Sequence, residues 1–169
     1  MTKSENQSPK VFLISRTFDS PRNLVVRAFT EGERLSKWWG PKGLEFVKCT
    51  LDLRPGGLFH YCMRSPDGNE MWGKFVYHEI ELPDRMVFVN SFSDASGRTT
   101  RAPFNPNWPL EVRNLVTFTE DGAKTTVTLR GAPINASDAE IAAFESFFGS
   151  MEQGFGGTFD QLESYLSTL

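Results

Sequence analysis

The feature that most constrains the fold is a series of short strand patterns followed by one long apolar helical face. Between residues 44 and 130, segments rich in β-branched and aromatic residues alternate with turns rich in Gly, Pro and Asp. From residue 137 onward, apolar residues recur every three or four positions. A sheet and a helix that each have one apolar face bury those faces against each other, so the order predicts an α+β domain.

The strand patterns are joined by loops that are mostly short. A first strand is expected at residues 11–18, and two short helices are expected before residue 40, the second at 31–38. Short connections favour antiparallel neighbours, so we expect a meander. Its strands are predicted at 44–53, 58–64, 71–82, 86–93, 112–119 and 124–130.

The C-terminal segment predicts one helix of about thirty residues. Ser137 and Glu140 have the spacing of a capping box at its start. Gly149 and Gly154 lie inside the pattern, and each such glycine costs about 1 kcal/mol of helix stability relative to alanine. A close-packed neighbour or a local bend is expected to compensate.

Composition indicates an ordinary folded domain. The chain has 169 residues, of which 39% are hydrophobic and 23% charged, so we expect a single domain at 11–169. Residues 1–10 lack an apolar stretch and are expected to be a flexible tail rather than a secretory signal, which suggests a cytoplasmic protein. The net charge of −3 argues against nucleic-acid binding, and no apolar run suggests membrane insertion. Cys49 and Cys62 are expected to be free thiols.

The segment from Asp94 to Pro109 interrupts the strand series. It contains three prolines as well as Phe104 and Trp108. Loops of this length inside a domain are usually functional lids or disordered segments. The sequence leaves both interpretations open.

Six short motifs are distributed along the chain, namely Arg16-Thr17-Phe18-Asp19-Ser20-Pro21, Trp38-Trp39-Gly40-Pro41, Asp52-Leu53-Arg54-Pro55-Gly56-Gly57, Gly73 with Tyr77, Glu79 and Ile80, Pro83-Asp84-Arg85, and Met151-Glu152-Gln153-Gly154-Phe155. Through these motifs nearly the whole chain, residues 11–168, resembles the activator of heat-shock-protein ATPase homologue-like (AHSA-like) branch of the START-related (SRPBCC) superfamily. The resemblance implies a START-like (Bet v-like) helix-grip fold, in which a curved antiparallel sheet wraps around a long C-terminal helix. One residue departs from the family pattern, because Phe155 stands where the family usually has tryptophan.

The sequence offers no recognisable catalytic or metal-binding constellation. His60 and His78 do not lie in a ligand spacing, and no phosphate-binding loop follows a strand. We therefore assign no catalytic residue, metal or cofactor.

Aromatic residues suggest an apolar cavity between sheet and helix. The chain has 15 Phe and 4 Trp but only 3 Tyr. Most of these rings fit an ordinary core, yet a curved sheet facing one helix rarely fills all the space between them. Tyr61, Tyr77, Asn90 and Asn114 are the expected polar groups. The candidate wall residues are Trp38, Trp39, Phe59, Tyr61, Met63, Phe75, Tyr77, Phe88, Asn90, Phe92, Asn114, Val116, Phe118, Phe144, Phe148, Met151 and Phe155.

The favoured hypothesis is a non-catalytic domain that binds a small apolar or aromatic molecule. The resemblance also implies a chaperone ATPase activator-like interaction module as an alternative. A third possibility is a cyclase- or hydrolase-type enzyme that uses the same cavity. A homodimer is possible, and the sequence does not distinguish it from a monomer.

Overall fold

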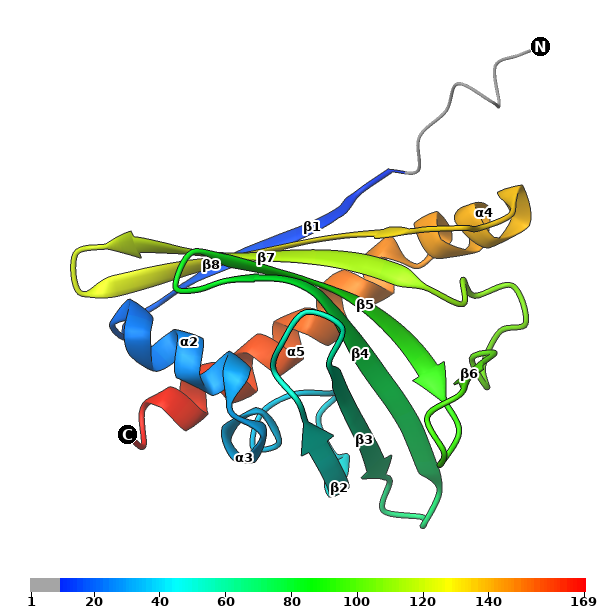
Figure 1. Cartoon of the computed structure of the whole chain (residues 1–169), viewed down its shortest axis with the longest axis horizontal. Coiled ribbons are helices and arrows are strands. Elements are labelled where there is room, and N and C mark those ends of the chain that lie inside the picture. The colour runs from blue at the N-terminus through cyan, green and yellow to red at the C-terminus, as the bar shows by residue number, and fades with distance from the viewer. Residues whose placement is uncertain (1–9) are drawn as a thin grey trace.

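The computed structural model describes residues 10–169, in which a curved antiparallel sheet wraps around a C-terminal helix (Figure 1). The expected tail at 1–10 therefore falls outside the described residues except for Lys10. The elements in chain order are β1 (Phe12–Phe18), α2 (Arg22–Thr30), α3 (Gly32–Leu35), β2 (Glu45–Leu51), β3 (Leu58–Arg64), β4 (Glu70–Glu81), β5 (Arg85–Ser93), β6 (Thr99–Thr100), β7 (Val112–Asp121), β8 (Lys124–Pro133), α4 (Asp138–Ser146) and α5 (Phe148–Leu166).

The sheet has the predicted meander topology. Its strand order is β1-β8-β7-β5-β4-β3-β2, and the short β6 pairs with β5. The last strand, β8, pairs with the first strand, β1, which forms one edge of the sheet. The fold class predicted from the sequence, a helix-grip fold, is confirmed.

The register places the predicted apolar positions on the concave face. Phe59 pairs with Phe75, Phe75 with Asn90, and Asn90 with Val112. Paired residues point to the same side of a sheet, so one row of side chains crosses from β3 to β7. This row faces α5.

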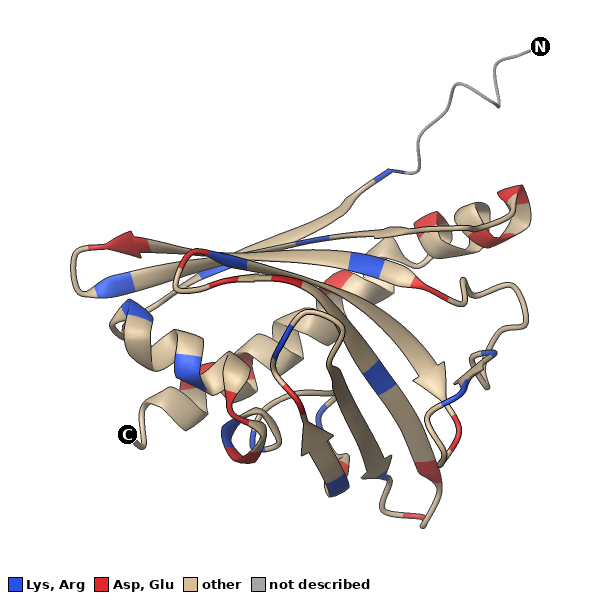
Figure 2. Cartoon of the chain, in the orientation of Figure 1, with Lys and Arg blue, Asp and Glu red and all other residues tan. Residues whose placement is uncertain are grey.

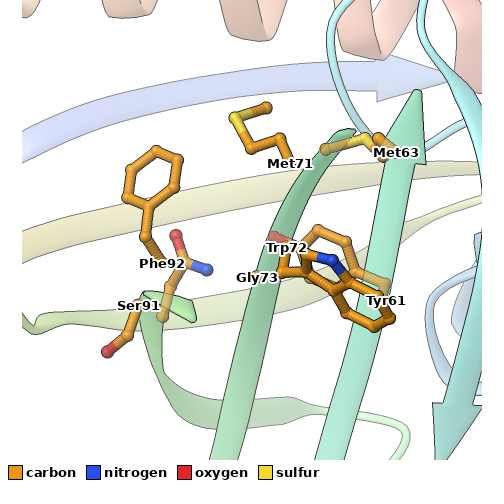
Figure 3. Close-up of a pocket in the computed structure, with 8 residues that line it drawn as sticks. Tyr61, Met63, Met71, Trp72, Gly73, Ser91 and Phe92 are labelled. Carbon is orange, nitrogen blue, oxygen red and sulfur yellow. The ribbon is translucent and has the colours of Figure 1, made fainter. Parts of the chain in front are cut away.

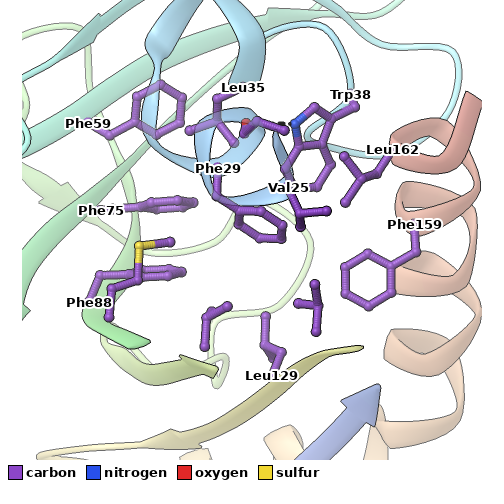
Figure 4. Close-up of a cluster of buried hydrophobic side chains, with 14 of the residues drawn as sticks. Val25, Phe29, Leu35, Trp38, Phe59, Phe75, Phe88, Leu129, Phe159 and Leu162 are labelled. Carbon is purple, nitrogen blue, oxygen red and sulfur yellow. Dashed lines mark hydrogen bonds between the residues drawn. The ribbon is translucent and has the colours of Figure 1, made fainter. Parts of the chain in front are cut away.

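A dense aromatic core fills the space between α2, the sheet and the C-terminal half of α5 (Figure 4). Trp38 is 1% exposed, and its indole N–H donates to the backbone oxygen of Ala28 at 2.9 Å. The Trp38 ring lies 4.6 Å from that of Phe29, centroid to centroid, in an edge-on arrangement. Phe159 and Leu162 of α5 are fully buried in the same cluster. This end of the domain is solid.

The C-terminal helix is divided, in contrast to the single helix that the pattern predicted. Ser137 and Glu140 do form the predicted capping box at the start of α4. Phe147 then leaves helical geometry, with φ −98° and ψ 4°, and α5 begins at Phe148. The Phe147 ring lies against Phe104 and Trp108, with centroids 5.8 Å and 5.5 Å away. Contacts with a segment distant in sequence therefore accompany the break.

Tyr77 places a polar atom in the solid core. Its side chain is fully buried, and its hydroxyl has no hydrogen-bond partner among the described residues. A buried polar group without a partner costs about 1–3 kcal/mol. Burial also raises the pKa of Tyr77.

We expect Tyr77→Phe to stabilise the protein. The substitution removes the unpartnered hydroxyl and keeps the ring, so the free energy of unfolding should rise by about 1 kcal/mol and the melting temperature by about 2–4 °C. Urea and thermal denaturation followed by circular dichroism measure both quantities. A lower stability of the variant would show that the hydroxyl has a partner.

Stability should also fall at alkaline pH in a way that depends on Tyr77. An unfolded tyrosine ionises near its ordinary pKa of 10.0, whereas the buried Tyr77 keeps its proton, so the unfolded state is favoured as the pH rises above that value. Between about pH 9 and about pH 11, we expect the wild type to lose about 1 kcal/mol more stability than Tyr77→Phe. Equal losses in the two proteins, measured by urea denaturation at each pH, would contradict this assignment.

Candidate functional site

A pocket of about 340 Å³ lies at the other end of the concave face, beside the N-terminal half of α5. Its size falls in the range of small-molecule sites. Strands β3, β4 and β5 form its floor, and α5 forms one side. The lining residues are Trp39, Gly40, Pro41, Tyr61, Met63, Met71, Asn90, Phe92, Phe104, Trp108, Phe147, Ser150, Met151, Gly154, Phe155 and Thr158.

The structure divides the predicted wall residues between this pocket and the packed interior. Seven of them line the pocket, namely Trp39, Tyr61, Met63, Asn90, Phe92, Met151 and Phe155. The other ten lie in the core or against it, namely Trp38, Phe59, Phe75, Tyr77, Phe88, Asn114, Val116, Phe118, Phe144 and Phe148. Among the expected polar groups, Tyr61 and Asn90 reach the pocket, whereas Tyr77 and Asn114 are buried away from it.

Several lining residues were not among the predicted ones. Phe104 and Trp108 come from the loop whose role the sequence left open, and Phe147 comes from the helix break. Met71 pairs with Met63, so the same alternation that selected Met63 could have selected it. Gly154 and Thr158 lie four residues apart on α5. The wall was predicted from aromatic and apolar residues, so a glycine and a threonine could not be selected in that way.

The loop Trp39-Gly40-Pro41 is fixed to α5 by hydrogen bonds. Thr158 Oγ1 and Gln161 Nε2 donate to the backbone oxygen of Gly40 at 3.0 Å and 2.8 Å. Gly40 has φ +101°, and a Cβ there would lie 2.5 Å from Met63 Sδ, so any other residue would be strained and would displace the Met63 side chain. The Trp39 ring is thereby held edge-on to Phe75, 5.1 Å between centroids. This wall of the pocket is preorganised.

Tyr61 lies beside Gly73 at the inner end of the pocket (Figure 3). It pairs with Gly73 on β4, and a Cβ at Gly73 would lie 2.6 Å from the Tyr61 hydroxyl oxygen. The glycine therefore lets the ring lie across the neighbouring strand. Burial raises the pKa of Tyr61, and hydrogen bonding by Trp39 and Asn90 offsets part of that rise.

The loop between β5 and β7 covers the outer end of the pocket. The Phe104 ring contacts Phe92 of β5 and Phe147, with centroids 5.8 Å away in each case. Trp108 packs on Phe144 of α4 at 5.4 Å. Phe104 remains 54% exposed, so it stands at the boundary between pocket and solvent. The loop thus has the position of a lid.

An ion pair attaches this lid to α4. Arg101 contacts Glu140, the same residue that closes the capping box with Ser137, and also donates to the backbone oxygen of Trp108 at 3.3 Å. The Arg101 guanidinium, with the Ser137 N–H, holds the pKa of Glu140 below its ordinary value. Glu140 therefore stays ionised at neutral pH, and the attachment persists there.

The pocket wall is uncharged. Among the described residues that line it, none is Asp, Glu, His, Lys or Arg, and Tyr61 is the only one with a titratable side chain. Charged residues of both signs are interspersed over the elements outside it (Figure 2). His60 lies outside the pocket, where its ring stacks on Trp72 and its Nε2 is 3.1 Å from the backbone oxygen of Asp94.

Residues 10–169 contain neither a candidate metal-binding cluster nor a helix suited to span a membrane. No group of three or more His, Cys, Asp or Glu side chains in that range is arranged to hold a metal ion. No helix in that range has the length and apolarity to cross a membrane. Cys49 and Cys62 are free, Cys62 buried and Cys49 half-buried.

These features define a helix-grip domain with an apolar pocket between its sheet and its C-terminal helix. The chain belongs to the family described as activator of Hsp90 ATPase homolog 1-like protein, which matches residues 19–167. A comparison with curated proteins gives no match.

Solved structures with the same fold come from several bacteria. The crystal structure of protein NE0264 from Nitrosomonas europaea is 26% identical, with a TM-score of 0.73 over 96% of this chain and 97% of that chain. A solution structure of a protein from Arthrobacter aurescens is 25% identical, with a TM-score of 0.77 over 95% of this chain and 88% of the other. Protein Ms6760 from Mycobacterium smegmatis is 25% identical, with a TM-score of 0.73 over 92% and 90%. The fold therefore spans nearly the full length of each.

We expect Arg101→Gln to loosen the lid. The substitution removes the ion pair with Glu140 but leaves the aromatic contacts, so backbone amides at about 101–110 should exchange with deuterium roughly twofold to fivefold faster. Arg98→Gln is the matched control, because Arg98 lies in the same loop and donates a hydrogen bond to Asp94 through its backbone N–H, which the substitution keeps. Equal exchange in the two variants would mean that the ion pair does not hold the lid.

Proposed function

We propose that this protein binds a small, uncharged, mostly apolar or aromatic molecule in the pocket between β3–β5 and α5. The observation that carries the proposal is a pocket of about 340 Å³ whose wall is mainly apolar, with aromatic rings from sheet, loop and helix, and contains no charged side chain among the described residues. Such a wall favours neutral apolar ligands, because a charged ligand would lose its hydration without gaining a partner.

The arrangement of the wall supports binding by a largely preformed site. Trp39 is held by the loop that α5 anchors, and Phe155 packs on Trp39 at 6.0 Å and on Phe12 at 5.6 Å. Side chains that are already ordered lose little conformational entropy when a ligand enters. The covering loop supplies two further rings, Phe104 and Trp108, that a bound ligand would contact.

The two alternatives receive less support from these residues. An acid–base enzyme needs a group that exchanges protons near neutral pH, whereas burial raises the pKa of Tyr61, the one titratable group of the wall. A chaperone-activating role is suggested by the family description alone. The pocket gives the binding proposal a specific location and a specific test.

Gly154→Leu should block the pocket. Gly154 lies on α5 between two lining residues one turn away on either side, Ser150 and Thr158, and a Cβ at Gly154 would meet no atom within 4 Å. A leucine there fits the helix and occupies space that a ligand would need. We expect the affinity for N-phenyl-1-naphthylamine, a neutral aromatic probe that fluoresces in apolar sites, to fall at least roughly tenfold.

Gly149→Leu is the matched control. Gly149 lies on the same helix, outside the pocket lining, and its added Cβ would also meet no atom within 4 Å. Both variants gain helix propensity, so a difference in probe binding reports the pocket alone. Probe binding that is equal in wild type and both variants, or absent in all three, would contradict the proposed function. If only Gly154→Leu loses probe binding, native mass spectrometry of protein purified from its own host would identify the resident molecule.

A further inference from the structure

A second, smaller cavity of about 30 Å³ adjoins the pocket at its inner end (Figure 3). It shares Tyr61, Met63, Met71, Asn90 and Phe92 with the larger pocket. Its volume is that of about one water molecule or one small polar substituent. It is therefore too small for a ring and large enough for a single oxygen-containing group.

The polar side chains of the pocket are distributed unevenly. The Thr158 hydroxyl is buried and lies within hydrogen-bond distance of the backbone oxygens of Gly40 and Gly154, at 3.0 Å and 3.1 Å. Ser150 is exposed on the α5 side of the pocket. Tyr61, which is 6% exposed, Asn90 and Ser91 are left as the polar side chains of the inner end.

The donors and acceptors at this end favour an oxygen acceptor on the ligand. The indole N–H of Trp39 and the side-chain amide of Asn90 are donors close to the Tyr61 oxygen, and both lower the pKa of Tyr61 against the larger effect of burial. One Asn90 N–H is also used, because Nδ2 donates to the backbone oxygen of Lys74 at 3.1 Å. The phenolic proton of Tyr61 is then available to a hydroxyl or carbonyl oxygen placed beside it.

Gly73 makes this position accessible. Any larger residue would place its Cβ 2.6 Å from the Tyr61 hydroxyl oxygen and 2.7 Å from the ring carbon that carries it. The bare backbone at Gly73 therefore sets the orientation of the Tyr61 ring and keeps its hydroxyl at the small cavity. The same two strands contribute Met63 and Met71, which surround the hydroxyl with apolar surface.

We propose that the ligand is an apolar ring system with one uncharged oxygen substituent, a hydroxyl or a carbonyl, which enters the small cavity and accepts a hydrogen bond from Tyr61. This inference rests on the proposed function and specifies the ligand class of the same site. The rest of the ligand lies against the aromatic wall and beneath the Phe104 and Trp108 loop.

A pair of nearly isosteric probes tests the proposal. 2-Naphthol and 2-methylnaphthalene differ by a hydroxyl in place of a methyl group, and their dissociation constants can be measured by displacement of N-phenyl-1-naphthylamine. In the wild type, the ratio of the 2-methylnaphthalene constant to the 2-naphthol constant should be at least about fivefold larger than in Tyr61→Phe, the scale of one neutral hydrogen bond. Comparing ratios removes the difference in hydration between the probes.

Tyr77→Phe is the control for this experiment. It makes the same chemical change in the solid core, outside both cavities, so its ratio should equal that of the wild type. If both probes bind and Gly154→Leu excludes them, but Tyr61→Phe leaves the ratio unchanged, the oxygen subsite is overturned while the pocket function stands. If neither probe nor the fluorescent reporter binds the wild type, the proposed function itself fails. Loss of all binding in Tyr61→Phe alone would also overturn the subsite, because it would assign Tyr61 a role in pocket structure.

Discussion

The packing of α5 against the concave face of the sheet is the interaction on which the rest of the structure depends. The helix changes character along its length, because Phe159, Leu162 and Leu166 are buried in the core while Met151, Gly154 and Phe155 line the pocket. At the C-terminal half, α2 adds a third layer and the space is filled. At the N-terminal half, α2 does not cover the sheet, so the sheet and α5 leave the pocket between them. The Phe104–Trp108 loop covers its outer end.

Glycines have distinct roles around the pocket. Gly40 adopts a backbone conformation that other residues rarely adopt, and it lies against Met63. Gly73 gives the Tyr61 ring room to cross β4. Gly154 leaves space along α5 where a side chain would project. The sequence predicts that close packing or a local bend compensates for the interior helix glycines. Gly154 lies beside open space instead of a close-packed neighbour, and its cost in helix propensity is accompanied by room in the pocket.

The two buried tyrosines show how position determines the role of a polar group. Tyr77 lies among Phe75 and Phe88 in the core, and its hydroxyl has no partner among the described residues. Tyr61 lies on β3, the strand next to the β4 strand of Tyr77, and is two residues from Phe59. Its side chain reaches the small cavity beside Asn90. Burial raises the pKa of both. Their sequence environments are similar, since each occurs in an alternating aromatic strand.

The sequence by itself determined the fold, because apolar periodicity and turn residues act over short distances. The alternation at Phe59, Tyr61 and Met63, the turns between strands and the Ser137 capping box all appear where they were predicted. Only the tertiary structure decided which aromatic residues form solid core and which form the pocket. That choice depends on where α2 covers the sheet, on the break at Phe147 and on the path of the Phe104–Trp108 loop. These are contacts between segments far apart in the chain, and no local pattern encodes them.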